Sequence, residues 1–347
     1  MNERSKSLAY AAAQTARVAF YGMHYLAARI VARDAFAEIP VPEHPIPSLA
    51  TTFAAMRDLF VQDWRNVEAG LYPAPIDLAG EMREAMKSAR FLADIPRVAR
   101  RRRRRGHSEV KGEGDLPRYF RQNFHFQTGG YLSRDSAKLY DFQVEALFAG
   151  TADAMRRQAF VPIAKFLETR DPAKTTLLDI GAGTGRFLSF VKHVEPELQA
   201  IALDLSEPYL EEAGRNLSRE RHIRYVHAPA EKMPLKNRSV DCAVSIYLFH
   251  ELPPKVRAAV AKEIARVLKP GGMFVLADSI QYGDAPAFDG MIDVFPHLLH
   301  EPYFSSYAKT DFAKLFGDVG LKREKSDVAY LTKIAVFRKP RARRRAR

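Results

Sequence analysis

Between Thr175 and Ser279, short apolar runs alternate with segments of helical periodicity. The apolar runs predict strands at 175–180, 199–204, 223–227, 240–246 and 272–279. The segments between them predict helices at 186–194, 207–217 and 254–268. This alternation is typical of a doubly wound parallel sheet with helices on both faces, and it constrains the fold more than any other feature.

Two further strands are predicted in close succession near the end of the chain. They lie at 322–329 and 331–338, after the helical segment KTDFAKLFGDV. Strands joined by so short a connection are antiparallel neighbours. We therefore expect an α/β fold with a mostly parallel, seven-stranded sheet whose last strand is antiparallel.

The N-terminal region is predicted to be helical. An alanine-rich helix is expected at 8–37, and another at about 78–92. Between them, Ser48 is placed as the N-cap of a helix whose apolar residues recur every three or four positions; these are Leu49, Phe53, Met56, Phe60, Trp64 and Val67. Two more helices are expected at 136–149 and 151–168.

These elements predict five parts of the chain. They are a helical N-terminal region (1–96), a basic and polar linker (97–118), an aromatic lid segment with helices (119–170), the sheet domain (171–338) and a basic tail (339–347). The N-terminal helices are expected to form a lid or the surface of a homodimer.

Two arginine-rich segments account for the basic composition. The net charge is +13, and residues 97–105 and 338–347 each contain seven basic residues and no acid. The rest of the chain is therefore nearly neutral. Blocks of like charge tend to be solvated, and their contacts with RNA, DNA or anionic lipid have little sequence specificity.

Cys242 is the one cysteine of the chain, which excludes an intrachain disulfide. No uncharged apolar stretch is long enough to span a bilayer, and the N-terminus lacks the layout of a signal peptide. We expect a cytoplasmic protein with no membrane span.

The turn after the first predicted strand reads LLDIGAGTGR, residues 177–186. It lacks the Gly-Lys-Ser/Thr ending of a phosphate-binding loop, and Arg186 breaks the G-x-G-x-x-G/A spacing of a dinucleotide site. An acid two residues before the first glycine would repel a pyrophosphate but suits a ligand with an ammonium and a sulfonium group. Asp204, about 20 residues further on at the end of the second strand, suits ribose hydroxyls.

Five segments together resemble the successive motifs of class I S-adenosylmethionine-dependent methyltransferases, with the small-molecule and quinone methyltransferases as the most similar branch. They are LLDIGAGTGR, AIALDLS, APAEKMPL, SVDCAVSIYLFHEL and EIARVLKPGGMFVLADS. The resemblance implies S-adenosylmethionine as the cofactor. It implies cofactor contacts for Asp179, Gly181, Gly183, Gly185, Asp204, Leu205, Glu231 and Ser245, and Tyr131 is expected to close over the cofactor.

Where this family often has Asp-Ala-Glu near the adenine, the chain has Pro229-Ala230-Glu231. The aspartate is replaced by proline, so Glu231 or a backbone amide is expected to take over the adenine contact.

The expected reaction is methyl transfer to the oxygen or carbon of a small, partly apolar acceptor such as a phenol, quinol or polyketide-like compound. Candidate catalytic residues are His250, His300 and Glu301, which follow the fourth and fifth strands. No metal site is expected. The alternatives are an RNA or protein methyltransferase guided by the arginine segments, and a non-catalytic scaffold that binds the cofactor.

Overall fold

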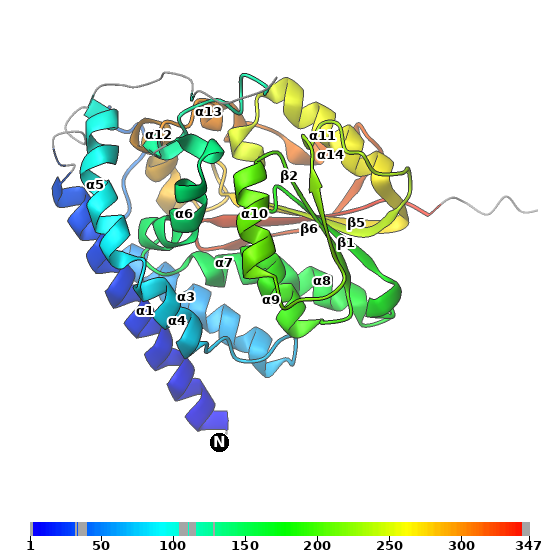
Figure 1. Cartoon of the computed structure of the whole chain (residues 1–347), viewed down its shortest axis with the longest axis horizontal. Helices are drawn as coiled ribbons and strands as arrows, with labels where there is room; N and C mark the ends of the chain where they lie inside the picture. The colour runs from blue at the N-terminus through cyan, green and yellow to red at the C-terminus, as the bar shows by residue number, and fades with distance from the viewer. Residues whose placement is uncertain are drawn as a thin grey trace, which may run out of the picture. The chain divides into compact units, whose positions relative to one another are not determined.

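The chain forms two compact units in the computed structural model (Figure 1). The helical unit comprises Met1–Arg157 and Ala287–Glu301, and the sheet unit comprises Gln158–Pro286 and Pro302–Arg347. Within these spans the structure describes residues 3–31, 33, 40–103, 110, 116–127 and 129–341.

The sheet unit contains seven strands in the order β3-β2-β1-β4-β5-β7-β6. Their bounds are β1 Thr176–Ile180, β2 Gln199–Asp204, β3 Ile223–His227, β4 Val240–Ile246, β5 Leu268–Ser279, β6 Lys322–Ala329 and β7 Thr332–Arg338. β1 to β5 are parallel, and β7 pairs antiparallel with both β5 and β6. The predicted α/β fold with an antiparallel last strand is confirmed.

Helices cover this sheet. They are α8 Phe160–Leu167, α9 Arg186–Val194, α10 Glu207–Asn216, α11 Pro254–Val267, α13 Phe304–Tyr307 and α14 Phe312–Gly317. Figure 1 shows α9 beside α10, and α11 beside α14. The central strands β1, β4 and β5 are buried almost throughout, as expected when helices pack on both faces.

The helical unit contains α1 Glu3–Val31, α3 Leu49–Glu68, α4 Leu78–Ala85, α5 Ser88–Arg103, α6 Arg134–Leu147, α7 Ala152–Gln158 and α12 Asp289–Leu299. Ser48 is the N-cap of α3, and its Oγ accepts a hydrogen bond from Thr51 N at 3.0 Å. The predicted apolar face of α3 is only partly buried, because Leu49 and Phe53 are exposed while Met56 is buried.

The helical unit has a buried polar centre at Asp63. Its carboxylate accepts hydrogen bonds from Tyr10 Oη at 2.6 Å, Tyr72 Oη at 2.7 Å and the Arg157 guanidinium at 2.6 and 3.0 Å. Burial, followed by the Asp63 charge, holds the pKa of both tyrosines well above the usual range. The three partners tie α1, α7 and the segment after α3 to one side chain.

The first arginines of the predicted linker belong to a helix. α5 continues through Pro96 to Arg103. Arg101 donates to the carbonyl of Gln127 at 2.5 Å, and Arg102 donates to the carbonyl of Leu298. Residues 97–103 are therefore structural, in contrast to the linker expected from their charge, whereas 104–109, 111–115 and the tail beyond 341 lie outside the described residues.

Among the helices that the structure describes, none combines the length and the apolar character needed to cross a membrane.

Candidate active site

The glycine turn lies between β1 and α9, at the carboxyl edge of the sheet. Gly181, Gly183 and Gly185 all have positive φ, at 75°, 54° and 75°. The backbone N–H groups of Gly181 and Ala182 donate to the carbonyl of Leu203 at 2.8 and 3.0 Å, which joins the turn to β2. Left-handed backbone conformations favour glycine, so the turn requires this sequence.

Two of these glycines have different surroundings. A Cβ atom added at Gly185 would lie 2.7 Å from Leu217 Cδ1 and 3.2 Å from Ala213 Cβ, because the turn packs closely on α10. A Cβ atom at Gly183 would have a single neighbour within 4 Å, Tyr209 Cδ1 at 3.9 Å. The lack of a side chain at Gly185 therefore lets the turn pack closely on α10. At Gly183 there is open space beside the backbone, which a ligand can occupy.

Asp204 ends β2 and is hydrogen-bonded to the turn. Its Oδ2 accepts from Gly183 N at 2.8 Å, and its Oδ1 accepts from Ser206 N at 2.7 Å. These bonds fix the carboxylate at the carboxyl edge of the sheet, half-buried beside the open side of Gly183. A carboxylate held in this way can accept further hydrogen bonds from a diol.

Asp179 is buried in β1, with 2% of its surface exposed. Burial and then the nearby charge of Asp204 raise the pKa of Asp179 to about 8. The pKa of Asp204 is also raised, mainly by burial. Among the described residues, no lysine or arginine forms an ion pair with either acid. The two acids and the space at Gly183 fit a ligand that has a positive charge and a ribose.

The other predicted cofactor residues lie as follows. Leu205 follows Asp204, and its carbonyl lies 2.9 Å from His227 Nε2. Glu231 is half-buried in the turn after β3, and Ser245 is fully buried in β4. Tyr131 belongs to the helical unit, where its ring centroid lies 5.6 Å from that of Phe124. Cofactor contacts for these four residues remain predictions.

His250 forms a pair with Asp278, an acid that the sequence analysis did not single out. His250 lies in a short 3-10 helix after β4, and its Nδ1 is 2.6 Å from Asp278 Oδ1 at the end of β5. Asp278 is fully buried and also accepts from the backbone N–H of Phe249 at 2.7 Å and of Ser279 at 2.8 Å. A carboxylate can only accept, so Nδ1 is the donor and Nε2 has the lone pair in the neutral ring.

Aromatic side chains surround this pair. The ring centroids of Phe304 and Tyr307 lie 6.1 and 6.0 Å from that of His250. Tyr307 donates from Oη to the carbonyl of Ser279, and burial holds its pKa well above the usual range. Its phenol therefore remains protonated at neutral pH.

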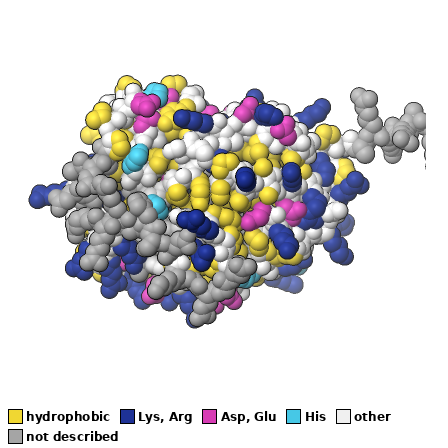
Figure 2. All heavy atoms as spheres, turned by 90° about the horizontal axis from the view of Figure 1, so that it is seen from above, with side chains coloured by type: hydrophobic (Ala, Val, Ile, Leu, Met, Phe, Trp, Pro, Cys, Tyr) yellow, Lys and Arg dark blue, Asp and Glu magenta, His cyan; other side chains and the backbone are white. Residues whose placement is uncertain are grey.

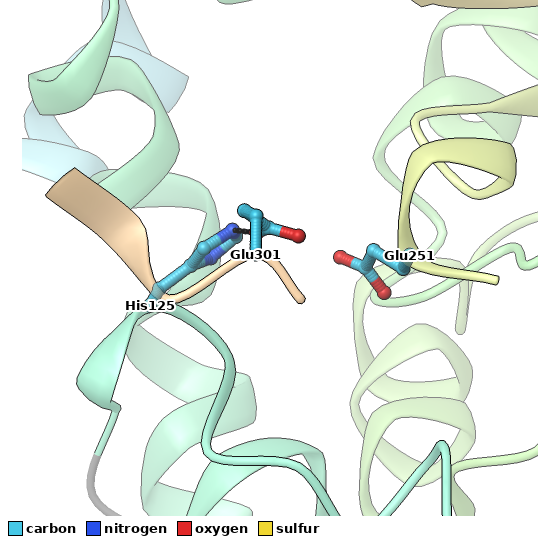
Figure 3. A group of neighbouring side chains, drawn as sticks. All are labelled: His125, Glu251 and Glu301. Atoms are coloured by element: carbon cyan, nitrogen blue, oxygen red, sulfur yellow. Dashed lines mark ion pairs between the residues drawn. The ribbon is translucent and has the colours of Figure 1, made fainter. Parts of the chain in front are cut away.

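His300 and Glu301 belong to the helical unit, whereas His250 belongs to the sheet unit. His300 ends α12 with φ of 50°, and its ring centroid lies 5.7 Å from that of Phe126. Glu301 is buried, with its Oε1 2.5 Å from His125 Nε2, and Figure 3 shows the two side chains pointing toward one another.

The orientation of His125 follows from its other neighbours. Ser136 Oγ donates to Gln127 Oε1 at 2.6 Å, so the Gln127 amide nitrogen faces His125 Nδ1 at 3.2 Å. This contact makes Nδ1 an acceptor and places the ring proton on Nε2, toward Glu301. The sequence analysis did not single out His125, because the local sequence FHFQ gives no sign that its partner is Glu301, far along the chain.

Comparison with known proteins agrees with this geometry. Residues 178–276 match a family model described as a methyltransferase domain. The chain is 37% identical over 112 residues to a malonyl-[acyl-carrier protein] O-methyltransferase of Marinomonas sp., covering 32% of this chain and 40% of the relative. It is 34% identical over 102 residues to a demethylmenaquinone methyltransferase of Protochlamydia amoebophila, covering 28% of this chain and 41% of the relative.

A third relative acts on a different class of molecule by name. The chain is 26% identical over 149 residues to a probable tRNA methyltransferase 9B of Homo sapiens, covering 42% of this chain and 31% of the relative. The matches thus span less than half the length of each of these three relatives.

The strand order, the glycine turn joined to Asp204 and the matched family model point to one conclusion. The cofactor that this family implies is S-adenosylmethionine, and the acids and open glycine described above fit it. The chain contains a methyltransferase domain of the class I S-adenosylmethionine-dependent superfamily.

Proposed function

We propose that this protein transfers a methyl group from S-adenosylmethionine to a small, partly apolar acceptor, a phenol, quinol or polyketide-like compound, at oxygen or carbon. The observation that carries the proposal is the buried His250–Asp278 pair among aromatic rings at the carboxyl edge of the sheet. An apolar ring with one ionisable hydroxyl matches such surroundings: the aromatic side chains favour the ring, and the imidazole accepts the proton.

The cofactor residues have distinct roles in this proposal. Asp204 accepts hydrogen bonds from the ribose hydroxyls, because Gly183 N and Ser206 N already orient its carboxylate. Asp179 attracts the positive charge of the methionine end. When bound, the cofactor supplies an electrophilic methyl group. Micromolar affinity, about −8 kcal/mol, is expected.

His250 acts as the general base at Nε2. Its Nδ1–H donates to Asp278, which fixes the ring orientation and the tautomer. Glu251 Oε1 lies 3.9 Å from Nε2, so carboxylates flank both sides of the ring. They favour the imidazolium that forms when the acceptor loses its proton. Asp278 is a positioning residue in this scheme.

The names of two relatives support a small acceptor, a quinone in one case and a carrier-bound malonyl group in the other. The tRNA methyltransferase relative supports the alternative of an RNA acceptor guided by the arginine segments. The one cysteine of the sequence, Cys242, is free and buried, and the lack of a possible intrachain disulfide supports a cytoplasmic location.

The test measures release of S-adenosylhomocysteine with a panel of phenols and quinols, and in parallel with tRNA and a basic protein. Turnover of a phenol or quinol is expected. His250→Asn should lower its single-turnover rate ~100-fold, and Asp278→Asn should lower it at least ~10-fold, with cofactor affinity unchanged in both. His193→Asn is the control, because His193 is an exposed histidine on α9.

Methyl transfer to tRNA alone would replace the small acceptor with RNA. A small acceptor that is methylated equally fast by the His250 variant would remove the base from the scheme. The pH profile adds a separate reading: the wild-type rate should rise with pH as the imidazole loses its proton, and this rise should be absent in His250→Asn.

A further inference from the structure

A cavity of about 630 Å³ lies in the sheet unit. It is formed at strands β5, β6 and β7, whereas the glycine turn follows β1. It is lined by residues of α8, the start of β5, the start of β6 and the end of β7. Met273 pairs with Arg338 where β5 begins and β7 ends, so the cavity lies at the amino edge of the parallel strands. At the opposite edge, Asp179 is the penultimate residue of β1 and Asp204 is the last residue of β2.

Basic residues dominate this cavity. Half of its lining side chains are lysine or arginine, with a single acid, Glu324; the basic ones are Lys165, Arg170, Lys325, Arg338, Lys339 and Arg341. Lys and Arg side chains gather at the right-hand end of the view in Figure 2, which belongs to this unit. This composition favours an anionic ligand.

Contacts within the cavity fix two of the guanidinium groups. Arg338 forms a bidentate ion pair with Glu324, at 3.0 Å from Nε and 2.9 Å from a terminal nitrogen. Arg170 donates to the carbonyl of Phe166 at 2.6 Å, and its guanidinium lies 3.6 Å from the centroid of the Phe166 ring. Arg338 is therefore neutralised by Glu324, whereas the contacts with Phe166 hold the guanidinium plane of Arg170 without an acid.

Four cations of the lining form no ion pair within the described part of the chain. Arg170 and Lys339 donate to backbone carbonyls, and no ion pair is formed by Lys165 on α8 or by Arg341 after β7. The one acid of the cavity is already neutralised by Arg338. The cavity therefore has a positive charge that its own residues do not balance.

We propose that this cavity binds a multivalent phosphate group, of the di- or triphosphate class. Its volume falls in the range of small-molecule sites, roughly 300–1,000 Å³, and is larger than a single phosphate needs. Lysine and arginine side chains bind phosphate oxygens through charge-assisted hydrogen bonds, and Lys165 and Arg341, which form no ion pair within the described residues, supply charge that Glu324 does not balance. The site is separate from the methyl-transfer edge, so the proposal does not depend on the acceptor.

Calorimetry with inorganic triphosphate, on the full chain, tests this proposal. The wild type should bind it, and the double variant Lys165→Glu/Arg341→Glu should bind at least ~10-fold more weakly because two attractive charges become repulsive. The matched control is Arg219→Glu/Lys309→Glu, which changes the net charge equally at two exposed residues of the same unit. It should bind within about twofold of the wild type, once screening by salt is held constant.

Cofactor affinity is measured on the same samples and should be equal in all of them, which separates a failed phosphate site from a failed methyltransferase assignment. Absence of triphosphate binding in the wild type would overturn the proposal, as would equal losses in the two double variants. A third contradiction would be binding that survives in Lys165→Glu/Arg341→Glu but disappears when residues 342–347 are deleted. If an RNA oligomer binds and triphosphate does not displace it, the basic residues bind an extended nucleic-acid backbone and not a small phosphate compound.

Discussion

Asp179, a proposed cofactor residue, lowers the stability of the folded protein. Its carboxylate is buried in β1, and burial together with the charge of Asp204 raises its pKa to about 8. The folded protein therefore binds this proton more tightly than the unfolded chain, whose aspartates have an ordinary, low pKa. Stability falls as pH rises from that low value, and the full loss is present above about pH 8.

Asp179→Asn should remove this loss. The variant should match the wild type in strongly acidic solution and exceed its free energy of unfolding by on the order of 2 kcal/mol at neutral to alkaline pH. Urea denaturation across this pH range measures the difference. Asp58→Asn is the control, because Asp58 is exposed on α3 and pairs with Arg57.

The same variant should bind S-adenosylmethionine less tightly, since it lacks the charge that attracts the methionine end. In the wild type the affinity should increase with pH up to about 8, because the cationic ligand favours the ionised form of Asp179. A stability difference that does not change with pH would contradict the raised pKa.

At the scale of elements, the glycine turn combines two requirements in one short segment. Gly185 starts α9 with φ of 75° and packs against Leu217 of the α10 region, whereas Gly183 borders open space. Gly185 therefore allows the turn to pack closely on α10, whereas Gly183 borders the space that we propose for the cofactor.

A pair of alanine substitutions separates these requirements. Each places a Cβ atom on a left-handed backbone, at a cost of roughly 1–2 kcal/mol. Gly185→Ala should lose a further ~1–3 kcal/mol of stability, because its Cβ overlaps the side chain of Leu217. Gly183→Ala should stay folded but bind the cofactor at least ~10-fold more weakly, because its Cβ occupies ligand space. Denaturation and calorimetry on both variants measure this, and an equal loss of stability in the two would show that Gly183 also serves packing.

The central strands β1, β2, β4 and β5 were predictable from the sequence because each contains a local apolar run that ends at a turn. The edge strand β6, which reads KREKSDVA, has no such run. Helix ends were less predictable. The segment expected as one helix at 151–168 is divided into α7 and α8, because Pro162 has no N–H to donate to Gln158 four residues earlier. The arginine run was expected to be a linker on charge alone, yet arginine is a good helix former and α5 continues to Arg103.

The residues of the candidate site also differ in how well the sequence predicts them. Asp179, Gly183 and Asp204 were predictable because an acid or glycine at a strand end is a local signal. Asp278 has that signal too, at the end of VLAD, and could have been recognised as the partner of His250. His125 and Glu301 could not be paired, since they come from segments that only the tertiary structure brings together.

At the scale of the whole molecule, each unit has a polar centre of its own. The sheet unit contains Asp179, Asp204 and the glycine turn, whereas the helical unit is tied together at the fully buried Asp63. The Asp63 carboxylate neutralises Arg157 and accepts from two tyrosine hydroxyls. This division predicts that stability of the helical unit and cofactor affinity can be changed independently.

Asp63→Ala tests that independence. Loss of the carboxylate leaves Arg157 buried without its partner, so the helical unit should lose about 3–5 kcal/mol of stability. Calorimetric cofactor binding below the unfolding temperature should stay within ~10-fold of the wild type, because the glycine turn and both acids lie in the sheet unit. Asp58→Ala, an exposed position on the same helix, should change neither quantity. A parallel loss of stability and cofactor affinity in Asp63→Ala would show that the helical unit, including Tyr131, contributes to the cofactor site.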